Sequence, residues 1–179
     1  MVIDKIPMQF KFSDSGMLIP RKYNIENLCW MNKPIGGLWT STVVGVRTYT
    51  VGINTYNIPY SDWMDWCLSE RFKVEDKILI IHPKKNLKIY DINQESDLMG
   101  LPIIKGDLFN CIDYEQLQKD NYDGVHISAY IAYKLHLHSI NKIMFNSWDS
   151  ESTCWFNMDW INSYKVIDFS SIKRSLNIV

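Results

Sequence analysis

The stretch DKILIIHP, residues 76–83, constrains the fold most, because it holds an unbroken apolar run between Asp76 and Pro83. A short apolar run bounded by turn-forming residues is typical of a strand that is buried on both faces. The stretch NLKIYDIN, residues 86–93, follows after the turn PKKN and alternates in character, which predicts a second strand. We expect these two strands to form the centre of a sheet.

The rest of the chain predicts an α+β fold in which strands dominate the second half. Helices are expected where a capping residue precedes apolar residues at helical spacing: residues 24–32, 61–72 and 113–121. Further strands are expected at residues 6–12 with a return strand at 17–23, at 38–44, 122–128, 152–157 and 164–169. Residues 129–138 fit either a helix or a strand, residues 45–60 suggest a long exposed loop with a strand edge, and residues 170–179 fold back or fray.

Length and charge limit the class of protein. A chain of 179 residues that is 46% hydrophobic can bury the core of one domain, and we expect a single domain over residues 1–179. The formal net charge is -1, so no overall positive field favours a nucleic-acid backbone, and any contact with nucleic acid must be local.

Cysteine use and the N-terminus bear on location. The four cysteines lie far apart without a CxxC motif or a histidine pair at ligand spacing, which predicts neither a disulfide framework nor a metal site. No signal-peptide pattern and no window of 18 apolar residues occurs. We therefore expect a soluble cytoplasmic protein that uses no metal and does not enter a membrane.

Several common active-site motifs are missing from the sequence. It contains no GxGxxG after a strand, no GxxxxGK[ST], no HExxH and no GxSxG, so dinucleotide-fold, P-loop, zincin and hydrolase classes have no support. His136 and His138 form a close pair in the stretch HLH, which on a strand would place both rings on one side. This pair is the basis of one open alternative, an RNA-processing or nuclease-like enzyme.

Two stretches carry the main functional hypothesis. In KPIGGLWTST, residues 33–42, a glycine pair precedes a strand with consecutive hydroxyl side chains, which suggests that something approaches the backbone closely there. In WDSESTCW, residues 148–155, Asp149 and Glu151 would share one face of an extended segment. The same acidic stretch also fits an ordinary exposed turn.

Four short motifs resemble those of a family of small bacterial and phage proteins: GGLWTS at 36–41, SDWMDWC at 61–67, YDG at 122–124 and WDSES at 148–152. With the segments between them, they span about residues 33–160. That family is similar, more distantly, to the ADP-ribosyltransferase superfamily, which consumes NAD and includes bacterial toxins, poly-ADP-ribose polymerases and RNA 2'-phosphotransferases. The resemblance implies mixed or antiparallel sheets that form a split cleft, with a few short helices.

The resemblance also implies a transferase that moves ADP-ribose from NAD to an unknown protein or nucleic-acid acceptor, in conflict between bacteria and phages. NAD would be held by a basic residue on the first strand and by a strand with aromatic and hydroxyl side chains: Arg21, Lys22, Gly36, Gly37, Trp39, Thr40 and Ser41. The catalytic acid would be Asp149 or Glu151, with Ser152 in support and Asp149 slightly preferred. Cleavage at the ribose develops positive charge, which a carboxylate stabilises.

A second alternative stays open beside the nuclease-like one. The chain is rich in tryptophan and tyrosine, with 7 and 10 residues, and exposed aromatic side chains anchor protein interfaces. A phage or mobile-element protein that inhibits a host factor by binding it would use them in this way. Convergence of Arg21, Trp39 and Asp149 on one pocket favours the transferase, whereas their dispersal favours the binding protein.

Overall fold

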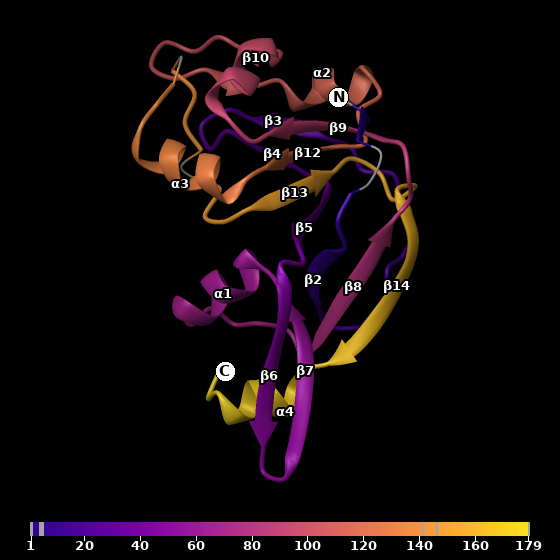
Figure 1. Cartoon of the computed structure of the whole chain (residues 1–179). Coiled ribbons are helices and arrows are strands. Elements are labelled where there is room, and N and C mark those ends of the chain that lie inside the picture. The colour runs from indigo at the N-terminus through magenta and orange to yellow at the C-terminus, as the bar shows by residue number, and fades with distance from the viewer. Residues whose placement is uncertain (1, 4–5, 141, 146, 179) are drawn as a thin grey trace.

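The computed structural model describes residues 2–3, 6–140, 142–145 and 147–178, and an eight-stranded mixed sheet runs through it (Figure 1). In sheet order the strands are β1 (Val2–Ile3), β9 (Leu87–Ile92), β12 (Gly124–Ile127), β13 (Ser152–Trp155), β5 (Leu38–Thr42), β2 (Gln9–Ser13), β8 (Lys77–Pro83) and β14 (Ile161–Asp168). The β9–β12 pair is parallel, and the other pairings of these strands are antiparallel.

Short elements surround this sheet. The two-stranded pairs are β3 (Glu26–Leu28) with β4 (Lys33–Ile35), β6 (Gly45–Val51) with β7 (Asn54–Tyr60), and β10 (Ile103–Ile104) with β11 (Cys111–Ile112). The helices are α1 (Asp62–Ser69), the 3-10 helix η1 (Glu95–Gly100), α2 (Tyr114–Lys119), α3 (Ala129–Leu137) and α4 (Ser170–Ser175). None of the helices in the described part of the chain is long and apolar enough to cross a membrane. The fold is therefore α+β, as predicted.

Two hydrophobic clusters lie along the sheet, and β8 contributes to both. Leu79 and Ile81 belong to the larger cluster, which packs under α2 and α3, whereas Ile78 and Ile80 belong to the smaller one beside α1 and α4 (Figure 1). Successive side chains of a strand point to opposite faces, so the continuous apolar run is explained by burial on both faces. This strand was predicted correctly.

Several other elements are confirmed, and capping residues explain where they begin. The Ser61 hydroxyl accepts a hydrogen bond from the backbone N–H of Met64 at 3.2 Å, which starts α1. Asp113 caps α2 in the same way, through the N–H of Gln116 at 2.9 Å. Residues 129–138, left open between helix and strand, form α3, and the C-terminal tail folds back as α4.

The expected position of β8 and β9 at the centre of the sheet is wrong. β9 is second and β8 is seventh in the strand order, so four strands lie between them. The turn between them therefore connects two distant parts of the sheet, and the centre is formed by β12, β13, β5 and β2. Sequence spacing does not reveal this crossover, because two strands joined by a short turn more often pair.

The predicted helix at residues 24–32 is also wrong, because this segment contains β3, which turns back into β4. Asn27 supplies part of the reason: its side-chain oxygen accepts a hydrogen bond from the N–H of Tyr114, and its amide donates to Asp113 at 2.9 Å. Asn32 has φ 47°, a left-handed conformation that ends any helix and suits a turn. Contacts with α2 thus override the local helical spacing.

Two further predictions, one of a loop and one of a strand, differ from the structure. Residues 45–60 form the paired strands β6 and β7 rather than a long loop, with the turn at Gly52 in a left-handed conformation, φ 61°. Half-buried and exposed side chains alternate along β6, so period-two alternation was present among threonine, tyrosine and valine. Conversely, the return strand expected at 17–23 does not form.

Candidate functional site

A charged side chain lies at the centre of the sheet where an apolar one would be usual. His126 on β12 is in register with Asp91 on β9 and with Thr153 on β13. Residues in register on neighbouring strands point to the same face, so these polar groups form a row. Glu151 immediately precedes β13 and completes the row beside His126.

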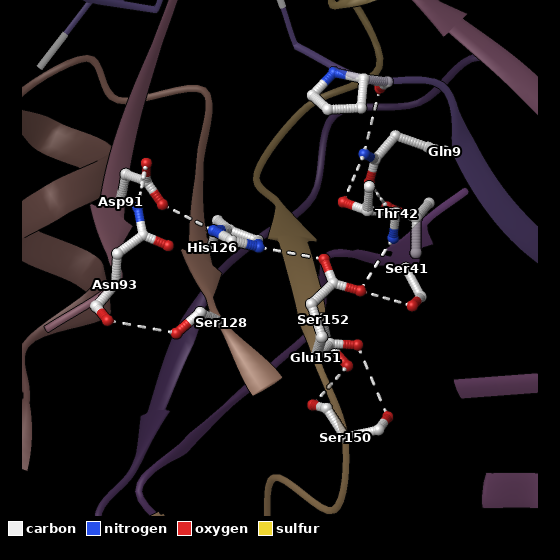
Figure 2. A network of polar contacts seen from close by, with 12 residues as sticks. Gln9, Ser41, Thr42, Asp91, Asn93, His126, Ser128, Ser150, Glu151 and Ser152 are labelled. Atoms are coloured by element: carbon white, nitrogen blue, oxygen red, sulfur yellow. Dashed lines mark hydrogen bonds and ion pairs between the residues drawn. The ribbon is translucent and has the colours of Figure 1, made fainter. Parts of the chain in front are cut away.

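The row is held together by short hydrogen bonds (Figure 2). His126 Nδ1 lies 2.6 Å from Asp91 Oδ1, and His126 Nε2 lies 3.0 Å from Glu151 Oε1. The second carboxylate oxygen of Glu151 accepts the Ser41 hydroxyl at 2.5 Å and the Thr42 backbone N–H at 2.8 Å. Both imidazole nitrogens and both Glu151 oxygens are therefore occupied, which fixes their orientation.

These contacts set the charges of the row. Burial lowers the pKa of His126, but the hydrogen bonds and charges of Asp91 and Glu151 outweigh it and raise the pKa to about 9. Burial raises the pKa of Glu151, but the bonds from His126 and Ser41 lower it below its usual value, and the pKa of Asp91 is lowered by His126 against the same effect. At neutral pH we therefore expect an imidazolium between two carboxylates.

This charge state limits the chemistry that the row can perform. An imidazolium with both N–H groups donated to carboxylates cannot accept a proton, so His126 is poorly placed to act as a general base. Glu151 is 6% exposed, yet it borders the pockets beside the sheet. A fixed, ionised carboxylate at a pocket wall is suited to stabilising positive charge on a bound group.

The pocket above the row, called here the His126 pocket, has a volume of about 410 Å³. Its polar lining includes Gln9, Asp62, Asp91, His126 and Glu151. Burial raises the pKa of Asp62, and the negative charges of Glu151 and Asp65 raise it further. Three carboxylates against one imidazolium leave the His126 pocket negative, which disfavours an anion directly above the row.

Two further pockets, each of about 370 Å³, continue from the His126 pocket one after the other. The middle pocket shares Asp62 and Glu151 with the His126 pocket, and it shares Trp66 and Asp149 with the tryptophan pocket. The tryptophan pocket is lined by four indole side chains, Trp39, Trp63, Trp66 and Trp148, together with Lys33. We call the three pockets together the Glu151 groove.

Lys33 gives the tryptophan pocket a positive group. Its ammonium lies 4.5 Å from the centre of the Trp39 ring and donates to the backbone oxygen of Ser147 at 3.2 Å. Burial lowers the pKa of Lys33, and the negative charge of Asp149 opposes that effect. The groove therefore has an acidic end at His126 and an aromatic end with one cation.

The structure brings several of the predicted residues to this groove. Glu151 and Ser41 are in direct contact, while Asp149 and Ser152 line the tryptophan pocket together with Trp39. Asp149 is exposed on the loop before β13, whereas Glu151 is buried in the hydrogen-bonded row. Of the two candidate acids, Glu151 is thus the one with a fixed position.

Other predicted binding residues have structural partners, although Thr40 also borders the tryptophan pocket. Thr40 is fully buried, donates to Gln9 Oε1 at 2.6 Å and accepts from Trp155 Nε1 at 2.8 Å. Gly36 and Gly37 have φ values of 87° and 80°. A Cβ at Gly36 would lie 2.5 Å from a backbone oxygen, and one at Gly37 would lie 2.5 Å from Cys154 Sγ. The glycine pair thus accommodates the protein's own chain.

Arg21 and Lys22 do not reach the Glu151 groove. They line a separate cavity of about 910 Å³, whose wall includes Phe156 and Asn157. These two residues follow the C-terminal end of β13, whereas Glu151 precedes its first residue. Trp39 and Asp149 therefore converge on one pocket, but Arg21 does not join them.

The histidine pair of the stretch HLH is not on a strand. His136 lies in the last turn of α3 and lines the middle pocket, whereas His138 is the residue that follows the helix. Within the residues that the structure describes, no group of three or more His, Cys, Asp or Glu side chains is arranged to hold a metal ion. The four cysteines are free thiols.

The central residues that sequence reasoning missed are His126 and Asp91. Both occupy polar positions in stretches that were predicted to be strands, with apolar Val125 and Ile127 on either side of His126. A charged residue on the inner face of a buried strand is a signal of function. That signal became specific only when the parallel β9–β12 pairing placed the two residues side by side.

Comparisons with protein-family models, curated proteins and solved structures found no match for this chain.

Proposed function

We propose that the protein is an NAD-consuming enzyme of the ADP-ribosyltransferase type, with Glu151 as the catalytic carboxylate. The observation that carries the proposal is that Glu151 is fixed by three hydrogen-bonding partners and lies where the His126 pocket and the middle pocket meet. The hydrogen bonds from His126 and Ser41 also lower its pKa, which favours the carboxylate. Ser41 and His126 act as positioning residues. The resemblance implies a catalytic acid late in the chain, and Glu151 is supported for that role because it contacts Ser41 on the hydroxyl-bearing strand β5 directly.

The chemistry requires little more than such a carboxylate. When the bond between the nicotinamide nitrogen and the ribose carbon breaks, the bonding electrons stay with nicotinamide, which leaves uncharged, and positive charge develops on the ribose. No proton has to reach the leaving group. A protonated His126 between two carboxylates is therefore compatible with this reaction, although it would be unsuitable for a reaction that needs a histidine base.

The shape of the Glu151 groove supports a ligand with more than one ring. Each of its pockets, at about 370–410 Å³, falls within the usual size range for a small-ligand site. Trp39, Trp63 and Trp66 offer flat surfaces to an aromatic ring, and Lys33 is a nearby partner for a phosphate oxygen. In this proposal the ribose next to nicotinamide lies against Glu151, and the acceptor is a macromolecular side chain, a nucleic-acid base or water.

Release of nicotinamide from NAD tests the proposal. We expect release by the wild-type protein and a loss of at least about a hundredfold in Glu151→Gln, which keeps the size of the side chain and removes its charge. Asp149→Asn is the matched control, because this acid lies two residues away and is exposed, and we expect it to change the rate by no more than a few-fold. Equal release by all three proteins would refute Glu151 as the catalytic acid.

A second candidate function has its own observation. Trp30, Leu108 and Phe109 are 76%, 79% and 52% exposed and line a common pocket away from the groove. Such a patch suits a protein that binds and inhibits a host factor. Absence of nicotinamide release with every acceptor class tried would make this candidate the leading one.

A further inference from the structure

A second cavity, called here the Arg21 pocket, lies away from the Glu151 groove. Its volume is about 910 Å³, and it is bounded by residues 18–22, the C-terminal end of α2 and residues 156–164. It shares no lining residue with any of the three pockets of the groove. A ligand bound here would therefore occupy a separate site.

Three cationic side chains from two segments line the Arg21 pocket: Arg21, Lys22 and Lys119. All three are exposed, and none of them forms an ion pair with a carboxylate in the part of the chain that the structure describes. Arg21 lies over the ring of Tyr23, 4.7 Å from its centre, which limits where its guanidinium points. Cations that form no ion pair with a carboxylate are available to bind an anion.

Two carboxylates also border the cavity, and they offset only part of this charge. Asp123 accepts the backbone N–H of Lys88 at 2.9 Å and the side-chain amide of Asn157 at 3.2 Å, so both of its oxygens are occupied. Asp159 is exposed. The two carboxylates together carry two negative charges, against three positive charges on the cationic side chains. The Arg21 pocket therefore carries an excess of positive charge, in contrast with the acidic end of the groove.

Aromatic side chains give the same cavity a flat surface. Tyr122 and Tyr164 both line it. The ring of Tyr122 is already covered by the ammonium of Lys88, 4.3 Å from its centre, and it contacts Tyr90. Tyr164 is 41% exposed on β14, so its ring is the one available for stacking with a base.

We propose that the Arg21 pocket binds a nucleoside phosphate, with the phosphates on Arg21, Lys22 and Lys119 and the base against Tyr164. Cations at one side of a cavity and a free aromatic ring at another match the two parts of such a ligand. The proposal does not depend on the function of the Glu151 groove, because the two sites have no residue in common.

Titration of ADP into the intact protein, followed by calorimetry, tests this site. We expect wild-type protein to bind ADP, and the double variant Arg21→Ala, Lys119→Ala to bind it at least about tenfold more weakly. Adenosine lacks the phosphates and inorganic phosphate lacks the base, so each should also bind at least about tenfold more weakly than ADP. Lys85→Ala is the control, since this exposed lysine lies outside the cavity, and its affinity for ADP should equal that of the wild type.

Three results would overturn the proposal: no binding of ADP by the wild type, equal binding by the wild type and the double variant, or adenosine binding as tightly as ADP. Lys119→Glu provides a second variant, because charge reversal at an exposed position leaves the core unchanged. Nicotinamide release should be unaffected by all of these substitutions, so failure of this site and failure of the Glu151 site are separate outcomes.

Discussion

The carboxylate of Glu151 accepts the hydroxyl of Ser41 at 2.5 Å, although 110 residues separate the two in the sequence. The contact arises because β13 and β5 are neighbouring antiparallel strands at the centre of the sheet. The same carboxylate also bonds to His126 on the other neighbour of β13. One side chain thus joins three adjacent strands at the wall of a pocket, and the predictions below concern its partners and surroundings.

Replacing His126 with Gln should change how stability depends on pH. The pKa of His126 is raised from 6.5 to about 9 in the folded protein, so its contribution to the free energy of unfolding is complete below about pH 6.5 and is lost as the pH rises through about 9. We expect wild-type protein to exceed His126→Gln by on the order of 2–3 kcal/mol near pH 6, and by much less near pH 10.

Urea unfolding at several pH values measures that difference. His82→Gln is the control, because His82 is exposed on β8, and it should follow the wild-type curve. At acid pH the dependence runs in the opposite direction, because the pKa values of Asp91 and Glu151 are lowered in the folded protein. The contribution of these two carboxylates to the free energy of unfolding is present above their usual pKa values and is lost as the pH falls through the lowered ones. A constant difference between wild type and His126→Gln from pH 6 to 10 would show that the imidazolium is not paired as described.

Replacing Gly37 with Ala should destabilise the protein through packing. A Cβ at this position would lie 2.5 Å from Cys154 Sγ and 3.0 Å from the backbone oxygen of Trp155, and the residue has φ 80°. We expect a loss of about 2–4 kcal/mol from the clash and the strained backbone together. Gly52→Ala is the matched control, with φ 61° and no atom within 4 Å, and it should cost about 1 kcal/mol. Equal losses would mean that the space beside Gly37 is open and free for a ligand.

Replacing Trp66 with Ala should weaken binding of NAD. Trp66 lines both the middle pocket and the tryptophan pocket, and its ring stacks on Phe72 with centres 4.7 Å apart. We expect the dissociation constant for NAD to rise about tenfold, as for the loss of one stacking surface. Trp30→Ala removes an indole that is 76% exposed and outside the groove, and it should leave the affinity unchanged. Quenching of tryptophan fluorescence by NAD compares the two, and equal affinities would remove the aromatic pockets from the proposed NAD site.

The local sequence pattern was sufficient to predict those helices and strands whose ends are determined by nearby residues. Ser61 and Asp113 cap the helices that they were expected to cap, and the apolar run of β8 is buried as predicted. Partners distant in sequence determined the rest. Asn27 contacts the N-cap residue of α2, 86 residues away, and residues 24–32 form the strand β3 and a turn in place of the predicted helix.

The candidate site could be predicted only in part, for a similar reason. Glu151 and Ser41 stood out because each lies in an unusual polar stretch, and their contact follows from the pairing of β13 with β5. His126 and Asp91 were inconspicuous, since each is a single polar residue in an ordinary strand. Their contact depends on the parallel pairing of β9 and β12. These strands are not joined by a short turn, so the sequence gives no local signal that they pair.

The most direct test of the account separates the rate of bond cleavage from the binding of NAD in one pair of proteins. If Glu151 stabilises positive charge that is present only as the bond breaks, Glu151→Gln should lower the single-turnover rate of nicotinamide release by at least about a hundredfold, while the dissociation constant for NAD changes by less than about threefold. A rate that falls only as far as the affinity falls, or a rate equal to that of the wild type, would contradict the account.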